Sequence, residues 1–139
     1  MADEKNSTGR TVWTDGSPPR LLVVDDAEDT RLLYASYLSM AGLVVDEARD
    51  GEEALAMVAK SPPRAVILDL AMPKLDGWEV TRLLKTGAST QDIRVIVVTS
   101  NAMPDQVARA RAAGADEVLI KPCLPEKLLD CVRDVLRRR

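Results

Sequence analysis

The 139-residue sequence contains no histidine. This absence excludes histidine-based acid–base catalysis, Ser-His-Asp triads, histidine-ligated zinc and a phosphohistidine carried by the chain itself. Cysteine is nearly absent as well, because Cys123 and Cys131 are the only two. Their spacing fits no zinc or redox motif, and a disulfide between two cysteines so late in the chain could not hold a whole domain together.

Long hydrophobic runs are also missing. Residues 1–20 lack the apolar stretch of a signal peptide, and no segment approaches the about 18 apolar residues of a transmembrane helix. We therefore expect a cytoplasmic protein. The 19 basic and 22 acidic residues give a net charge of −3, so no overall positive field attracts nucleic acid or a membrane surface. We expect neither as a partner.

Length and composition are those of one globular domain. The chain is about as long as one typical domain, and its hydrophobic and charged fractions of 46% and 29% are ordinary for such a domain. Residues 1–19 are polar and end in Pro18-Pro19, which predicts a flexible N-terminal leader. Residues 20–139 are then expected to form a single domain.

Short apolar runs alternate with segments of helical periodicity from residue 20 onward. Runs rich in β-branched residues predict buried strands at 21–24, 43–45, 65–68, 95–98 and 118–120. Between them apolar residues recur at three- and four-residue spacing, clearly at Leu32, Leu33, Tyr37 and Leu38 and weakly around 107–112. This alternation predicts an α/β fold with a single doubly wound five-stranded parallel sheet flanked by five helices.

Acidic residues and chain breakers refine this prediction. The second and fifth strands carry acidic residues, which places them at the sheet edges, as in the flavodoxin-like order 2-1-3-4-5. Gly42 and Gly114 are expected where helices end, and Pro104 and Pro125 where helices begin. Gly51 and Gly77, each after an aspartate, are expected in turns; Asp50 and Asp76 are these two aspartates.

Polar residues follow four of the predicted strands. Asp25 and Asp26 follow the first strand, Asp69 the third, Thr99 ends the fourth, and Lys121 follows the fifth. The carboxyl ends of parallel strands meet at one edge of the sheet, so these side chains are expected to converge. Neighbouring carboxylates repel unless a cation binds between them, and Mg²⁺ prefers such oxygen ligands. Because a lysine and a hydroxyl can hold phosphoryl oxygens and a carboxylate can act as a nucleophile, the pattern predicts a magnesium-assisted phosphoacceptor at Asp69.

With Met72-Pro73, Asp76-Gly77 and Pro122, these residues resemble the receiver (response regulator, CheY-like) domain of two-component signalling systems, over residues 20 to about 137. The resemblance implies that Asp69 accepts a phosphoryl group from a histidine kinase or a histidine phosphotransfer protein. It also implies direct magnesium binding by Asp26, Asp69 and the backbone carbonyl of Ala71, with Asp25 acting mainly through water. Thr99 and Lys121 would bind the phosphoryl oxygens, and the Lys121–Pro122 peptide bond would be cis.

The resemblance further implies a signalling switch rather than an enzyme. Because the chain ends shortly after the fifth predicted helix, we expect a stand-alone receiver that is a monomer or a weak dimer. Its downstream protein target is expected at the face of the fourth helix, fifth strand and fifth helix. Relatives often carry an aromatic residue where Val118 stands, so the signal would travel through the fourth helix and the loop before it.

Other functions are weighed against this one. A haloacid-dehalogenase-like phosphohydrolase would need a second aspartate at the position of Ala71, and a flavodoxin-like cofactor binder would need a Gly- or Ser/Thr-rich loop where 25–29 is acidic. A pseudo-receiver, which acts as a phosphorylation-independent protein-interaction module, stays open as the alternative. Ala71 also offers no side-chain base to an attacking water, which suggests a long-lived acyl phosphate.

Overall fold

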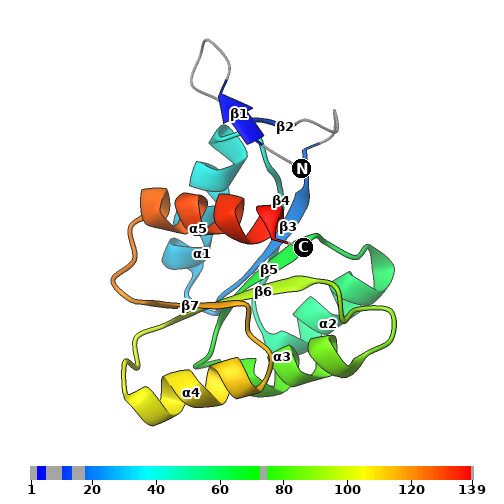
Figure 1. The fold of residues 1–139 in the computed structure, drawn as a ribbon, viewed down its shortest axis with the longest axis vertical. Coiled ribbons are helices and arrows are strands. Elements are labelled where there is room, and N and C mark those ends of the chain that lie inside the picture. Colours follow the sequence, from blue (N-terminus) through cyan, green and yellow to red (C-terminus); the bar gives the residue numbers. More distant parts are fainter. Residues whose placement is uncertain (1–2, 6–10, 14–17, 73–74, 139) are drawn as a thin grey trace.

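The computed structural model describes residues 3–5, 11–13, 18–72 and 75–138. Its main feature is a parallel sheet of five strands in the order β4-β3-β5-β6-β7 (Figure 1). The strands are β3 (Arg20–Val24), β4 (Val44–Ala48), β5 (Ala65–Asp69), β6 (Arg94–Thr99) and β7 (Glu117–Ile120). The predicted flavodoxin-like order, with the two acidic strands at the edges, is confirmed.

Five helices cover the two faces of this sheet. They are α1 (Glu28–Met40), α2 (Gly51–Lys60), α3 (Gly77–Thr86), α4 (Pro104–Ala112) and α5 (Pro125–Arg137). Helices α1 and α5 lie on one face, and α2, α3 and α4 lie on the other (Figure 1). Successive side chains of a strand point to opposite faces. Leu21 and Val23 of β3 therefore join the core under α1 and α5, and Leu22 and Val24 join the other core. The doubly wound α/β fold is confirmed.

The buried face of α1 differs from the predicted one. Leu32 and Leu33 are 44% and 54% exposed, so the prediction that both belong to the apolar stripe was wrong. The buried residues are instead Arg31, Tyr34, Ala35 and Leu38. They follow the i, i+3, i+4, i+7 spacing of one helix face, which includes Leu38 but neither Leu32 nor Leu33. The prediction assigned the wrong face of α1 to the core because it considered only apolar residues and therefore left out Arg31.

Helix ends follow the chain breakers, with one correction. Gly42 and Gly114 have positive φ angles of 101° and 109° after α1 and α4, a conformation that glycine adopts without strain. The predicted helix ends and the proline starts of α4 and α5 are confirmed. Gly51 and Gly77, however, are the first residues of α2 and α3 and do not lie in turns. The aspartates before them accept hydrogen bonds from the backbone N–H groups of Glu53 and Glu79, as N-caps do.

Two short segments near the N-terminus pair with each other. Strands β1 (Asp3–Lys5) and β2 (Thr11–Trp13) are antiparallel. The rest of the predicted leader lies largely outside the described residues, at 1–2, 6–10 and 14–17, so its flexibility stays a prediction. In the described part of the chain, no helix has the length and apolar character needed to cross a membrane.

The amino end of the sheet is held by a half-buried acidic residue, Asp116, which precedes β7. Its carboxylate accepts a hydrogen bond from the backbone N–H of Val95 at 2.8 Å and forms a 2.8 Å ion pair with Lys85 of α3. The Nη1 atom of Arg94 lies 3.4 Å from Asp116 Oδ1. Burial opposes ionisation, but the hydrogen bonds from Lys85 and Val95 hold the pKa of Asp116 below its usual value. Asp116 therefore ties the edge strand β7 to β6 and α3.

Asp116→Asn is expected to lower the free energy of unfolding by about 2 kcal/mol at pH 7. A carboxyl group whose pKa is lowered by folding, from about 3.9 in an unfolded chain, stabilises the fold above that pH and stops doing so as the pH falls through the folded-state pKa. The difference from the wild type should therefore shrink between pH 7 and about pH 3. Urea unfolding at several pH values measures it.

The matched control is Asp46→Asn on the opposite edge strand. Asp46 pairs with Arg20 at 2.9 Å, but both side chains are well exposed, at 38% and 44%. Its loss should change stability by less than about 1 kcal/mol. Equal effects of the two substitutions would contradict the anchoring role of Asp116.

Candidate functional site

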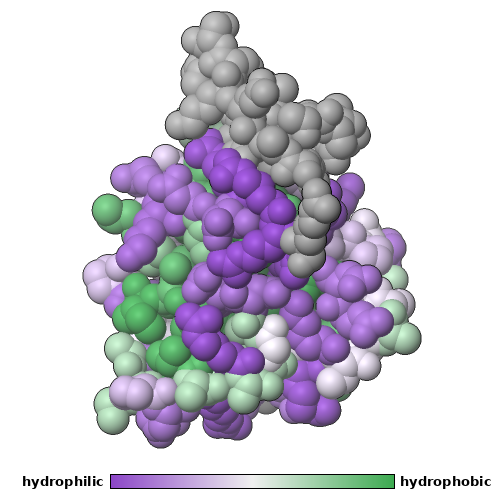
Figure 2. Space-filling model, in the orientation of Figure 1, coloured by the Kyte–Doolittle hydropathy of each residue, from purple (hydrophilic) through white to green (hydrophobic). Residues whose placement is uncertain are grey.

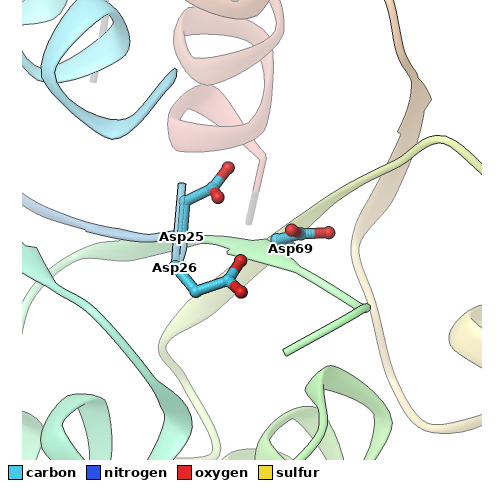
Figure 3. Close-up of side chains that lie close together, drawn as sticks. All are labelled: Asp25, Asp26 and Asp69. Carbon is cyan, nitrogen blue, oxygen red and sulfur yellow. The ribbon is translucent and has the colours of Figure 1, made fainter. Parts of the chain in front are cut away.

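Three carboxylates converge at the carboxyl edge of the sheet. Asp25 and Asp26 follow β3, and Asp69 is the last residue of the neighbouring strand β5. One oxygen of each lies within 4.8 Å of the others, and Figure 3 shows the three side chains next to one another at the ends of these strands. Asp25 is 3% exposed and Asp69 9%, whereas Asp26 is exposed. The predicted convergence of the three aspartates is confirmed as geometry.

Lys121 supplies positive charge to this cluster from the other half of the chain. Its Nζ donates a hydrogen bond to Asp25 Oδ2 at 3.3 Å and lies 3.7 Å from Asp69 Oδ2. The residue follows β7, and its backbone N–H donates to the carbonyl oxygen of Thr99 at 2.8 Å. The Lys121–Pro122 peptide bond is cis, as predicted.

Asp69 is in an environment that disfavours its charge. Burial raises the pKa of Asp69, the nearby carboxylate of Asp25 raises it further, and the ammonium of Lys121 partly opposes both. The N–H of Ala71 also donates to Asp69 Oδ1, at 3.2 Å. A second positive charge at the cluster would therefore stabilise the ionised form.

Thr99 and Ala71 complete the set of predicted residues. Thr99 is the last residue of β6, is 3% exposed, and its hydroxyl oxygen accepts a hydrogen bond from the backbone N–H of Asn101 at 3.1 Å. Ala71 is exposed and lies two residues after Asp69, between β5 and α3. The predicted role of its backbone carbonyl as a ligand stays a prediction. Pro73, part of the predicted motif, lies outside the described residues.

The loop after Asp69 is held close to the start of α3. The backbone N–H of Gly77 donates to the carbonyl oxygen of Leu70 at 3.1 Å. A Cβ atom at Gly77 would lie 2.6 Å from the backbone oxygen of Asp69 and from the Cα of Leu70. Only glycine therefore allows α3 to begin directly against the backbone that follows β5.

The donor set fits a hard divalent cation. Three carboxylates from two adjacent strands offer oxygen ligands on one side of the site, and Asp26 is open to solvent. The sequence contains no histidine, and nitrogen and sulfur ligands of the kind that favour zinc or copper are absent from this described cluster. Mg²⁺ is commonly held by one or two carboxylates together with waters and phosphate oxygens.

Sequence reasoning missed the residues that support the site from α1. Arg31 is buried and donates to Glu47 and to the backbone of Asp25, and the Tyr34 hydroxyl donates to the carbonyl oxygen of Cys123 at 2.9 Å. Glu47 was interpreted only as a mark of an edge strand. The i, i+3, i+4, i+7 spacing that begins at Arg31 would have indicated that this arginine lies on the buried face.

Comparison with known proteins identifies the class to which this fold and site belong. The response regulator receiver domain family matches residues 21–133, and the chain belongs to this family. Receiver domains are signalling switches of two-component systems rather than ordinary enzymes. Phosphoryl acceptance and magnesium binding in an acidic pocket are general properties of the family.

Particular relatives share most of this chain. Response regulator MprA of Mycolicibacterium vanbaalenii is 41% identical over 121 residues, which cover 87% of this chain and 52% of that protein. MprA of Mycobacterium leprae is 41% identical over 119 residues, or 86% of this chain and 51% of that protein. The chain thus spans about half the length of the curated relatives it matches.

Solved structures show the same fold. A putative response regulator from Chloroflexus aurantiacus superposes with a TM-score of 0.84 at 30% identity, over 88% of this chain and 100% of that one. Chemotaxis protein CheY4 of Vibrio cholerae gives a TM-score of 0.81 at 30% identity, over 86% and 99% of the two chains.

Lys121→Met is expected to destabilise the metal-free protein at pH 7, because it leaves the buried carboxylates of Asp25 and Asp69 without this neutralising charge. We expect the free energy of unfolding in EDTA to fall by about 2 kcal/mol, the scale of a hydrogen bond to a charged group. Urea unfolding provides the measurement. Lys127→Met removes the same charge from an exposed position of α5 and should have little effect; an equal loss would argue against neutralisation at the site.

Proposed function

We propose that this chain is a working receiver that accepts a phosphoryl group on Asp69 with Mg²⁺ and signals through protein contacts that depend on phosphorylation. The observation that carries the proposal is the position of Asp69. It lies at the end of a central strand, with a carboxylate oxygen within 4.8 Å of oxygens of two further carboxylates and 3.7 Å from the Lys121 ammonium. Membership of the receiver family supports the same assignment.

The chemistry required of the chain is a displacement at phosphorus. An Asp69 carboxylate oxygen attacks the phosphorus of a phosphohistidine, the new O–P bond forms as the P–N bond breaks, and the imidazole nitrogen keeps the electron pair as it leaves. Asp26 and Asp69, with the Ala71 carbonyl, would hold Mg²⁺, and Asp25 would act mainly through water. When bound, Mg²⁺ neutralises negative charge on the carboxylates and on the phosphoryl oxygens.

Lys121 and Thr99 are assigned to the phosphoryl oxygens. The ammonium of Lys121 already lies between Asp25 and Asp69, so it can move from carboxylate to phosphoryl oxygen over a short distance. The Thr99 hydroxyl accepts from Asn101, which leaves its proton free to be donated to a phosphoryl oxygen. Both residues would thus stabilise the phosphorylated state through hydrogen bonds to the phosphoryl oxygens.

The phosphodonor partner is proposed to dock beside α1. A hollow of about 480 Å³ lies next to Lys121 and is lined by Leu33, Tyr34, Ser100 and Pro122 among others. Figure 2 shows hydrophobic side chains gathered near the loop that leads from β7 to α5, and the exposed large hydrophobics include Met103, Ile120 and Leu124. An apolar surface around an otherwise polar site favours a protein donor, a histidine kinase or a histidine phosphotransfer protein.

The output of the switch is proposed to use the face of α4, β7 and α5. Helix α4 begins a few residues after Thr99 and buries only Ala110 among its described residues, so a change at Thr99 can shift it with little loss of packing. A cytoplasmic location, a monomeric or weakly dimeric state, and the absence of nucleic-acid and membrane partners belong to the same proposal.

Incubation with Mg²⁺ and acetyl phosphate tests the central claim. We expect the intact mass to rise by one phosphoryl group, with no gain in EDTA and none in an Asp69→Asn variant. Asp76→Asn, which alters a capping aspartate near the same loop, should still be phosphorylated. A protein that folds and binds Mg²⁺ but gains no mass would instead be a pseudo-receiver, a phosphorylation-independent interaction module.

Leu33→Glu tests the docking surface. With a phosphorylated histidine kinase that transfers to the wild-type chain, we expect transfer to slow about tenfold, as when a contacting apolar anchor is lost from an interface. Phosphorylation by acetyl phosphate should be unchanged, because Asp69 itself is intact. Met40→Glu, at a 75% exposed position near the far end of α1, is the control. Equal rates from the kinase for Leu33→Glu and the wild type would rule out this surface.

A further inference from the structure

Arg31 is a buried cation beside the acidic site. The residue is 8% exposed, and a charged side chain at that depth needs partners. Its Nε donates to Glu47 Oε1 on β4 at 3.0 Å, and its Nη1 donates to the backbone oxygen of Asp25 at 2.9 Å. Arg31 therefore joins α1 both to the edge strand and to the loop that carries the first two aspartates.

The backbone oxygen of Asp25 belongs to the peptide unit that leads into Asp26. The carboxylate of Asp25 is held by its own partners, the N–H of Ala27 at 2.9 Å and the Lys121 ammonium at 3.3 Å. The carboxylate of Asp26, by contrast, has no hydrogen bond or salt bridge with any residue that the structure describes. The direction in which Asp26 points is therefore set by its backbone, and Arg31 holds the peptide unit before it.

We propose that Arg31 is a positioning residue for divalent-cation binding: by holding the Asp25 carbonyl, it aims the Asp26 carboxylate into the site. The inference rests on the proposed function, in which Asp26 binds Mg²⁺ directly. The guanidinium is suited to this role because its planar fork reaches two acceptors on different elements at once. A lysine would keep the charge but not the fork.

The sign of the effect separates positioning from simple electrostatics. A positive charge near the three carboxylates repels an incoming cation, so if only the charge of Arg31 mattered, its removal would tighten Mg²⁺ binding. If Arg31 positions Asp26, its removal weakens binding. If it serves stability alone, its removal lowers the unfolding temperature but leaves the affinity of the folded protein unchanged.

Titration of the full chain with Mg²⁺ alone, by calorimetry at a temperature where each variant is folded, tests the inference. We expect Arg31→Gln to weaken Mg²⁺ binding about tenfold, as is typical when a residue that orients a metal ligand is lost. Arg31→Lys should also weaken it, although the charge is unchanged. Arg20→Gln is the matched control, because it removes the same charge and a different salt bridge to β4. Arg20 is the first residue of β3, at the end of that strand away from the site. This control variant should keep the wild-type affinity.

Each outcome decides the inference. A folded Arg31→Gln variant that binds Mg²⁺ as tightly as the wild type, or more tightly, overturns it. Should Arg31→Gln fail to fold, Arg31→Lys decides: weaker binding supports positioning, and wild-type affinity overturns it. A wild-type chain that binds no Mg²⁺ would refute the proposed function and this inference with it, which is distinct from a wild type that binds and an Arg31 variant that binds equally well.

Discussion

The mutual repulsion of Asp25, Asp26 and Asp69 is the constraint on which the carboxyl edge of this structure depends. A parallel sheet delivers the ends of adjacent strands to one place, and here it delivers three carboxylates within 4.8 Å. Two of them are buried, where an unbalanced charge is far less well solvated than in water. Lys121 balances part of this charge, and the remaining negative charge favours a cation at this edge of the sheet.

The acidic residues at the two ends of the sheet differ in how far their charge is neutralised. At the amino end Asp116 is fully engaged by Lys85 and by the backbone of β6, so its ionisation stabilises the fold. At the carboxyl end the acidic groups outnumber their described cationic partner, and Asp69 is left with a raised pKa. The ion pair of Asp116 holds the edge strand β7 in place. The uncompensated negative charge at the carboxyl end favours the binding of a cation.

Much of the fold and of the site could be predicted from the sequence because both follow from local patterns. Short β-branched runs marked the strands, and the acidic residues in 44–48 and at 116–117 marked the edges. The residues that end the runs, above all Asp69 and Lys121, predicted which side chains meet at the carboxyl edge, since parallel strands bring such residues together. The prediction failed on α1, where Leu32 and Leu33 are exposed while Arg31 is buried. A count of apolar residues alone does not place a charged residue on the inner face, although Arg31 shares the helical spacing of the buried residues. Its partners, Glu47 and the Asp25 carbonyl, come from other elements of the fold.

The sequence by itself determined the order of strands and helices, the helix ends at Gly42 and Gly114, and the residue types available at the carboxyl edge. These depend on interactions between near neighbours and on the fixed geometry of parallel strands. Only the tertiary structure decided which partners each charge received. It placed Lys121 between Asp25 and Asp69, seated Arg31 on the Asp25 carbonyl, and left Asp26 without a described partner. Such pairings join residues far apart in the chain, and packing selects them at distances of a few ångströms that no sequence pattern specifies.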